Sequence, residues 1–254
     1  MKRRTYHLPL LLTSVVLLAA WSLVAYAMRP RQEGGLLLLP GPLAVVRDLY
    51  HLLVDDRFLG DIALSSMRIG LGVLAATIPA AVFGIWFGIS PRVHAVASPL
   101  FAFVKYIPPV SFVPILILWF GIGLPQQVAL LFIGTFFYLA MMVAETVVDT
   151  PQAYKDAGLT LGLRERQLVW RVIIPHSMPA FFEHLRVMFG IAWTYLTVAE
   201  MVAAPNGIGR VIINSQRYLQ TGRVLAGMLT IGVLGVCFDL TLLRTSRWVC
   251  RWKG

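Results

Sequence analysis

Residues 127–148 read QVALLFIGTFFYLAMMVAETVV, and residues 149–179 continue DTPQAYKDAGLTLGLRERQLVWRVIIPHSMP. The first stretch holds one charged side chain in its whole length, and about 20 apolar residues are what a helix needs to cross a bilayer. The second stretch is polar, and a further apolar block follows it. This order is typical of a protein that crosses a membrane more than once.

The composition of the whole chain agrees with this interpretation. Of 254 residues, 58% are apolar and only 13% are charged, whereas about 25% are charged in soluble domains. The mean hydropathy is +0.75. A water-soluble domain of this size is therefore excluded, because it would lack the polar atoms to cover its surface.

The apolar residues collect in six blocks separated by polar segments. No block alternates polar and apolar residues as barrel strands do, so helices are expected to satisfy the backbone within the membrane. We predict an all-α polytopic membrane protein with six transmembrane helices. The predicted spans are about 8–28, 62–89, 94–120, 127–148, 180–203 and 224–245.

Two parts of the chain are distinguished. Residues 1–61 form an N-terminal span and an external amphipathic segment. Its apolar residues with helical spacing predict a surface helix at the bilayer edge that acts as a packing element; they are Val45, Val46, Leu49, Leu52 and Leu53. Residues 62–254 form a core of five spans with the inner loop 149–179. Glycines within the spans predict close helix packing. They are Gly70, Gly72, Gly84, Gly88, Gly227, Gly232 and Gly235.

The net charge of +10 indicates an orientation in the membrane and not nucleic-acid binding, because the basic residues are scattered and form no stripe with aromatic residues. With the N-terminus inside, predicted inner segments hold twelve Lys and Arg and outer segments hold seven. This bias predicts that both termini are cytoplasmic.

The sequence shows no catalytic grouping and no metal-ligand spacing. Cys237 lies within the last apolar block and Cys250 follows it, and their separation along one helix excludes a disulfide between them. The histidines and serines have no nucleophile-base spacing. We therefore expect neither a catalytic site nor a metal site.

The inner loop predicts a helix hairpin. A first helix is expected over Gln152–Leu161, a left-handed cap at Gly162, and a second helix over Arg164–Ile174. Pro175 and Pro179 are expected to break the chain before the fifth span. Either the hairpin merely caps the bundle, or the small residues after Asp156 allow a partner protein to approach the first helix closely.

A run of residues in this loop resembles the EAA loop of ABC-importer permeases. The resemblance rests on Asp156-Ala157-Gly158, on Gly162 six positions after Asp156, and on Val172-Ile173-Ile174-Pro175. Asp156 stands where that family usually has Glu, and Gly158 stands where it usually has a second Ala. Both differences are conservative in charge or size.

Other segments extend the resemblance to about residues 38–250. Tyr106-Ile107-Pro108-Pro109 followed by Trp119-Phe120-Gly121-Ile122-Gly123 is similar to the third-span signature of the subfamily that imports nitrate, sulfonates, taurine and bicarbonate. Further matches are residues 65–70, 199–201 and 207–209. The combined pattern is more specific than any single motif.

The resemblance implies a type I ABC importer permease fold and a cytoplasmic coupling helix between spans 4 and 5. Asp156, Ala157, Gly158 and Gly162 would contact a separate ATPase subunit, and Pro175 would fix the hinge to the membrane. The chain has no G-x-x-x-x-G-K-[ST] phosphate loop. ATP and Mg²⁺ would be bound by two copies of the ATPase, and no cofactor is expected here.

The same resemblance implies the remaining partners and the location. They are a periplasmic or lipid-anchored solute-binding protein and a second copy of this chain, in a bacterial inner membrane. The solute is expected to be a small anion, of the nitrate, sulfonate or bicarbonate class, although neutral and cationic vitamins remain open.

Four residues are candidates for the translocation path. Lys105 is a cation within the third span, and Pro108 and Pro109 are expected to break that helix beside it. The alternative is a kinked helix whose lysine reaches the interface. Glu200 is expected either to gate the path, to pair with Arg210 or to face water, and Asp239 is expected to pair with an unidentified neighbour.

Two other functions stay open on the residues alone. A secondary carrier driven by an ion gradient would require internal repeats and more charged residues within the spans. A non-transporting membrane anchor of a cytoplasmic complex would use the basic tail at residues 244–253.

Overall fold

The structure, a computed structural model, describes residues 7–28, 39–55 and 57–253. Every regular element in these ranges is helical. The elements are α1 (His7–Met28), α2 (Pro42–Asp55), α3 (Phe58–Ile89), α4 (Pro91–Tyr106), η2 (Pro109–Phe112), α5 (Val113–Phe120), α6 (Leu124–Val148), α7 (Gln152–Thr160), α8 (Glu165–Leu168), η3 (Val169–Ile173), α9 (Ile174–Ala203), α10 (Ile208–Arg217), α11 (Thr221–Val249) and η4 (Arg251–Lys253).

Four helices of the described ranges are long and apolar enough to cross a membrane: α3, α6, the continuous helix Glu165–Ala203, and α11. The bent pair of α4 with η2 and α5 gives a fifth span if it is counted as one. The predicted span 8–28 coincides with α1, and its residues Leu12–Met28 form an apolar helix that is not among the four spans above. The total of six spans therefore stays a prediction.

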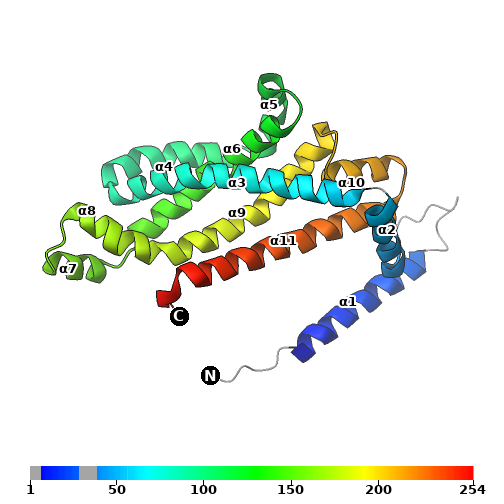
Figure 1. Ribbon diagram of the computed structural model, residues 1–254, viewed down its shortest axis with the longest axis horizontal. Helices are drawn as coiled ribbons and strands as arrows, with labels where there is room; N and C mark the ends of the chain where they lie inside the picture. The colour runs from blue at the N-terminus through cyan, green and yellow to red at the C-terminus, as the bar shows by residue number, and fades with distance from the viewer. Residues whose placement is uncertain (1–6, 29–38, 56, 254) are drawn as a thin grey trace.

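Helices α3 and α6 form the centre of the bundle (Figure 1). Gly72, Gly84 and Gly88 on α3 lie against Leu131, Val143 and Val147 on α6, so the two helices run in the same direction. A Cβ atom at Gly84 would lie 2.6 Å from the carbonyl oxygen of Ala140. Glycine is required there because a side chain would separate the helices.

The prediction of close packing at glycines is confirmed for Gly72, Gly84, Gly88 and Gly227, the last of which lies against Ile212. It is wrong for contacts within this chain at Gly70 and Gly232, where an added Cβ would meet no atom within 4 Å. At Gly235 the nearest atom, in Trp193, is at ordinary contact distance.

Helices α9 and α11 run antiparallel beside this centre. Arg186 on α9 donates two hydrogen bonds to Asp239 on α11, from Nε to Oδ1 at 2.6 Å and from Nη2 to Oδ2 at 2.8 Å. Asp239 thus has the neighbour that was expected, and Arg186 is its partner. Further along, Phe238 stacks on Phe189.

Two shorter helices lie at the end of the bundle opposite α7 (Figure 1). The predicted surface helix is present as α2, and Val45 and Leu52 are buried in its contact with the core. Helix α10 likewise buries Ile208 and Ile212 against α9 and α11. Both helices therefore act as packing elements.

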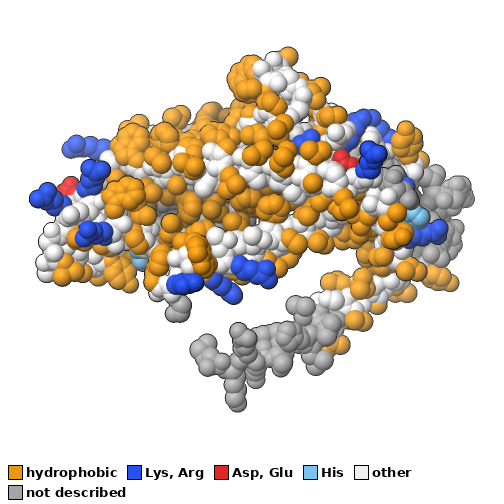
Figure 2. Space-filling view, viewed as in Figure 1, with side chains coloured by type: hydrophobic (Ala, Val, Ile, Leu, Met, Phe, Trp, Pro, Cys, Tyr) orange, Lys and Arg blue, Asp and Glu red, His pale blue; other side chains and the backbone are white. Residues whose placement is uncertain are grey.

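The surface agrees with a membrane location. Figure 2 shows hydrophobic side chains over the middle of the visible face, whereas Lys and Arg gather toward the ends of the molecule. Exposed apolar residues on α3 include Leu74, Ile78, Val82 and Trp86. At 1.5 Å per residue, α3 is about 48 Å long, which exceeds the roughly 30 Å hydrocarbon core.

Candidate functional site

The predicted hairpin is present at one end of the bundle. Helix α7 covers Gln152–Thr160, close to the expected Gln152–Leu161. Pro151 precedes its first turn, where the missing N–H of proline has no cost. Figure 1 shows α7 at one end of the bundle, joined to α8 by a short turn.

Gly162 ends α7 in the left-handed conformation that the sequence predicted, with φ +79. Leu163 N donates to Gly158 O at 3.1 Å, and Gly162 N donates to Leu159 O at 2.9 Å. These two bonds are those of a Schellman motif, which satisfies the last carbonyl groups of a helix. The turn between α7 and α8 is thus held by its own backbone.

Most side chains of α7 are exposed. Asp156 and Ala157 are exposed, as are the apolar Tyr154 (53%) and, just after the helix, Leu161 (83%). Asp156 Oδ1 accepts a hydrogen bond from Gln152 Nε2 at 2.9 Å, which keeps the carboxylate on the helix surface. The exposed face combines one acidic group with exposed apolar surface.

Gly158 does not lie on that exposed face, and its expected contact with a partner stays a prediction. It is buried, and an added Cβ would lie 2.6 Å from Leu168 Cδ1. The small residue therefore allows α7 to pack closely on α8. A helix of nine residues has one inward face, and Gly158 occupies it.

The prediction that Pro175 and Pro179 break the chain is wrong. The helix is continuous over Glu165–Ala203, with Pro175 at the start of α9 and Pro179 within it. The segment η3 just before Pro175 is a π-helix, and Ile174 N donates to Val169 O. The wider π-turn makes room for the proline ring before the α-helix resumes. The helix therefore continues through Pro175 instead of ending there.

The predicted break at Pro108 and Pro109 is confirmed. Helix α4 ends at Tyr106, and the axis bends by 79° before the pair η2 and α5 continues. Pro109 is buried beside Gly134 of α6, where an added Cβ would lie 3.3 Å from Pro109 Cβ. Figure 1 shows α5 at the edge of the bundle, where its Val113 and Leu116 are buried in a cluster with Leu130 of α6 and Ala199 of α9.

Lys105 lies in the last turn of α4, directly before the bend, and its side chain is half-buried. Its Nζ lies 5.6 Å from the centre of the Tyr138 ring on α6, within reach of a cation-π contact. Tyr138 Oη donates to the Lys105 carbonyl at 2.8 Å. One tyrosine thus holds both the backbone and the cation at the bend.

Glu200 has a different position from the one expected. Its side chain is fully buried and pairs with Arg68 on α3, with Nη1 and Oε1 2.7 Å apart, so the expected pairing with Arg210 is wrong. Ser65 Oγ donates to the same oxygen at 2.7 Å, and Gly209 N donates to Oε2 at 2.9 Å. The carboxylate therefore joins α3, α9 and α10.

The loop between α9 and α10 closes this cluster. Arg68 Nη1 donates to Asn206 O at 2.8 Å, and Gly207 N donates to Asp61 Oδ1 at 2.6 Å. We name Asp61, Ser65, Arg68, Glu200 and Gly207 the outer clasp. It lies at the end of the bundle opposite α7, and its contacts do not include Lys105.

The sequence did not identify Arg68 as the partner of Glu200 or Arg186 as the partner of Asp239. The available signal was that the predicted spans containing these two acidic residues occur together with spans containing Arg68 and Arg186. Charged residues within a membrane are usually paired. Which cation pairs with which acid depends on the packing of distant helices.

Comparison with known proteins decides the family. The family model described as "Binding-protein-dependent transport system inner membrane component" matches residues 69–249. The chain belongs to this family. The match spans α3 to α11 and includes the hairpin.

Relatives with assigned roles support this membership. The taurine transport system permease protein TauC of Escherichia coli is 30% identical over 247 residues, which cover 95% of this chain and 88% of TauC. The bicarbonate transport system permease protein CmpB of Synechococcus elongatus is 27% identical over 225 residues, which cover 84% of this chain and 81% of CmpB.

Two solved structures share the fold. A chain of the MetNI methionine ABC transporter, described as inward facing, has a TM-score of 0.57 at 18% identity and covers 82% of this chain and 95% of its own length. A chain of a bacterial ABC transporter involved in the import of the acidic polysaccharide alginate has a TM-score of 0.61 at 12% identity. The match covers 94% of this chain and 96% of that one.

This binding-protein-dependent permease is therefore a multi-pass inner membrane component of an ABC importer, and its partners are an ATPase and a solute-binding protein. This result decides against the secondary carrier and the non-transporting anchor that the residues alone left open.

Proposed function

We propose that α7 is the contact through which a separate ATPase subunit drives this permease. The observation that carries the proposal is the exposure of α7: Asp156, Ala157 and Leu161 face away from the bundle, while Gly158 fixes the opposite side of the helix to α8. An exposed apolar and acidic face on a firmly capped helix fits a groove on another protein.

The energy comes from that partner. The sequence lacks a G-x-x-x-x-G-K-[ST] phosphate loop, so two ATPase subunits bind ATP and Mg²⁺ and this chain acts without an ATPase site. Gly162 and the π-helix η3 before Pro175 set the angle at which α7 transmits movement to α9. Movement of α7 shifts the transporter between inward and outward access.

We further propose that both termini are cytoplasmic. Because α11 runs antiparallel to α9, its C-terminal end lies at the same end of the bundle as α7. That end carries Arg244, Arg247 and Arg251, as the positive-inside rule expects of a cytoplasmic segment. Lys2, Arg3 and Arg4, which oriented the first predicted span, lie outside the described residues.

The solute is a small anion of the taurine, sulfonate or bicarbonate class, imported by a homodimer of this chain. The names of the relatives support the class, and Lys105 beside the bend at Pro108 and Pro109 supports the charge. Broken helices beside a cation hold anionic solutes in other transporters. Glu200 belongs to the outer clasp, where it supports the path without contacting solute.

A pair of leucines provides the test. Leu161 and Leu43 are equally exposed, at 83%, but Leu43 lies on α2 at the opposite end of the molecule. We expect Leu161→Glu to insert normally, to lose co-purification with the ATPase and to abolish solute-stimulated ATP hydrolysis. Leu43→Glu should retain both. Normal stimulation in the Leu161→Glu complex would show that the assigned role of α7 is wrong.

A further inference from the structure

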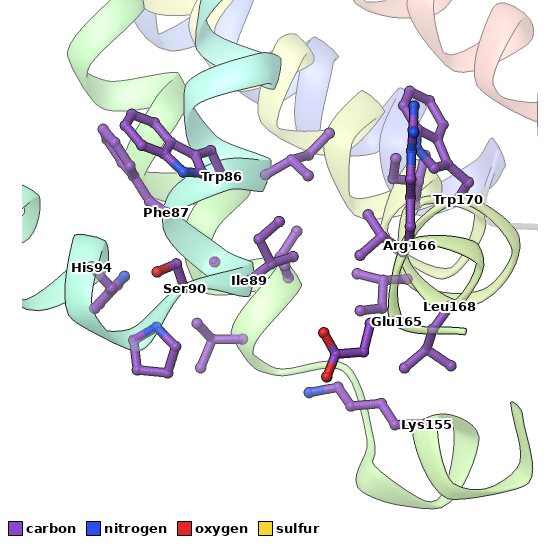
Figure 3. Close-up of a pocket in the computed structure, with 18 of the residues that line it drawn as sticks. Trp86, Phe87, Ile89, Ser90, His94, Lys155, Glu165, Arg166, Leu168 and Trp170 are labelled. Carbon is purple, nitrogen blue, oxygen red and sulfur yellow. The ribbon is translucent and has the colours of Figure 1, made fainter. Parts of the chain in front are cut away.

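A cavity of about 1050 Å³ lies between the hairpin and the ends of α3, α4 and α6. One wall comes from the last turns of α3 and the start of α4, and the other comes from α8 and η3 (Figure 3). Its size suits an organic ligand of considerable length, since drug-sized ligands occupy about 300–1000 Å³.

The lining of the cavity is mainly apolar and opens on the exposed surface of α3. Val82 is 61% exposed, Trp86 50% and Ile89 42%. Trp170 on η3 is 64% exposed on the facing wall. Tryptophans at the boundary of an apolar belt are typical of the membrane-water interface.

Charged groups line the cavity on the wall formed by the hairpin. Lys155 and Arg166 line the cavity with one carboxylate, Glu165, toward which Lys155 extends in Figure 3. Two cations against one anion leave a positive excess. His94 lies on the opposite wall, at the start of α4 (Figure 3), and its buried Nδ1 atom has no hydrogen-bond partner among the described residues. Lys155 and Arg166 can bind an anion whose remaining part is apolar.

We propose that the cavity binds an anionic phospholipid, with the headgroup phosphate at Lys155 and Arg166 and the acyl chains along Trp86 and Val82. Basic pockets beside membrane helices attract anionic headgroups. Because one wall is α8 and η3, the bound lipid bridges the bundle and the hairpin and restrains the hairpin. The inference requires only that α3 spans the membrane, and it holds whether or not α7 binds an ATPase.

The test uses the full chain in phosphatidylcholine nanodiscs that contain either brominated phosphatidylglycerol or brominated phosphatidylcholine. Bromine quenches tryptophan fluorescence on contact. We expect stronger quenching by brominated phosphatidylglycerol at equal content, and we expect Trp86→Phe with Trp170→Phe to abolish that excess. Trp248→Phe with Trp252→Phe, at the exposed C-terminal end, should retain it.

A charge-matched pair of double variants tests the headgroup site. Lys155→Gln with Arg166→Gln should lower the apparent phosphatidylglycerol affinity about five-fold for each cation removed, which corresponds to about 1 kcal/mol per basic residue. Arg164→Gln with Arg171→Gln changes the same charge on exposed residues of the same segment that do not line the cavity. It should leave the affinity near that of the wild type.

Three outcomes would overturn the proposal. Equal quenching by the two brominated lipids would show no headgroup selection, and equal losses in both double variants would show only general surface charge. Absence of quenching at Trp86 and Trp170 would show that protein, such as a second copy of the chain, covers the cavity. The tryptophan variants keep the test decisive if the charge variants fail to fold.

Discussion

Arg68 on α3 and Glu200 on α9 form a buried ion pair, with Nη1 and Oε1 2.7 Å apart. The Arg68 side chain is 7% exposed and the Glu200 side chain 0%. Ser65 and Gly209 donate further hydrogen bonds to the carboxylate, so the charge on Glu200 is compensated on several sides. This pair fixes the α9–α10 loop to α3 at the end of the bundle opposite the hairpin.

The first prediction concerns the cost of breaking this pair. Arg68→Met should destabilise the folded permease by about 3–5 kcal/mol, because it leaves a buried carboxylate without its cation. Arg68→Met combined with Glu200→Met should recover much of that loss. Thermal unfolding of the purified chain in detergent measures both, and a double variant no more stable than Arg68→Met alone would contradict the ion-pair account.

The second prediction uses two glycines of α3 as a matched pair. Gly84→Ala should destabilise by about 1–3 kcal/mol, because its Cβ would lie 2.6 Å from the Ala140 carbonyl oxygen and must push α6 away. At Gly70 an added Cβ meets no atom within 4 Å. Gly70→Ala should therefore stabilise the helix by about 0.5–1 kcal/mol. The same unfolding measurement checks both, and equal effects would argue against the α3–α6 packing.

Local chemistry explains which features the sequence could predict. The end of α7 at Gly162 and the bend at Pro108 follow from the backbone preferences of glycine and proline, which act within a few residues. The helix that continues through Pro175 was not predicted, because a π-turn compensates for the proline and leaves no simple pattern in the sequence.

Features that depend on distant contacts could not be predicted in the same way. Arg68 and Glu200 are 132 positions apart, and only the packing of α3 against α9 brings them together. The inward position of Gly158 likewise depends on where α8 lies. The sequence shows that Gly158 is a small residue in a predicted helix, but it does not show which neighbouring side chain packs against it.

The third prediction concerns the cap of α7. Gly162→Ala should destabilise the left-handed turn by about 1–2 kcal/mol, since an L-residue has a steric cost at φ +79. Hydrogen exchange should then increase for residues 152–163 and remain unchanged in α6. Gly190→Ala is the control, because an added Cβ at Gly190 meets no atom within 4 Å. Unchanged exchange in α7 would show that the Schellman motif does not hold the hairpin.

The fourth prediction concerns the charge at the bend of α4. Lys105→Met keeps an apolar stem over Tyr138 but removes the cation, so binding of an anionic solute in the path loses its electrostatic attraction. Uptake of a labelled aliphatic sulfonate or bicarbonate by cells should fall at least about tenfold, which corresponds to about 1.4 kcal/mol. Lys105→Arg, which retains the charge, should preserve most of the uptake.

A second variant separates this electrostatic role from a structural one. Tyr138→Phe loses the hydrogen bond to the Lys105 carbonyl but leaves the lysine charge in place. It should lower the thermal midpoint while keeping uptake above that of Lys105→Met. The proposal is contradicted if Lys105→Met imports the anion at the wild-type rate and only its thermal midpoint changes. Lys105 would then stabilise the bend without attracting the solute, because a purely structural contact affects stability and not solute binding.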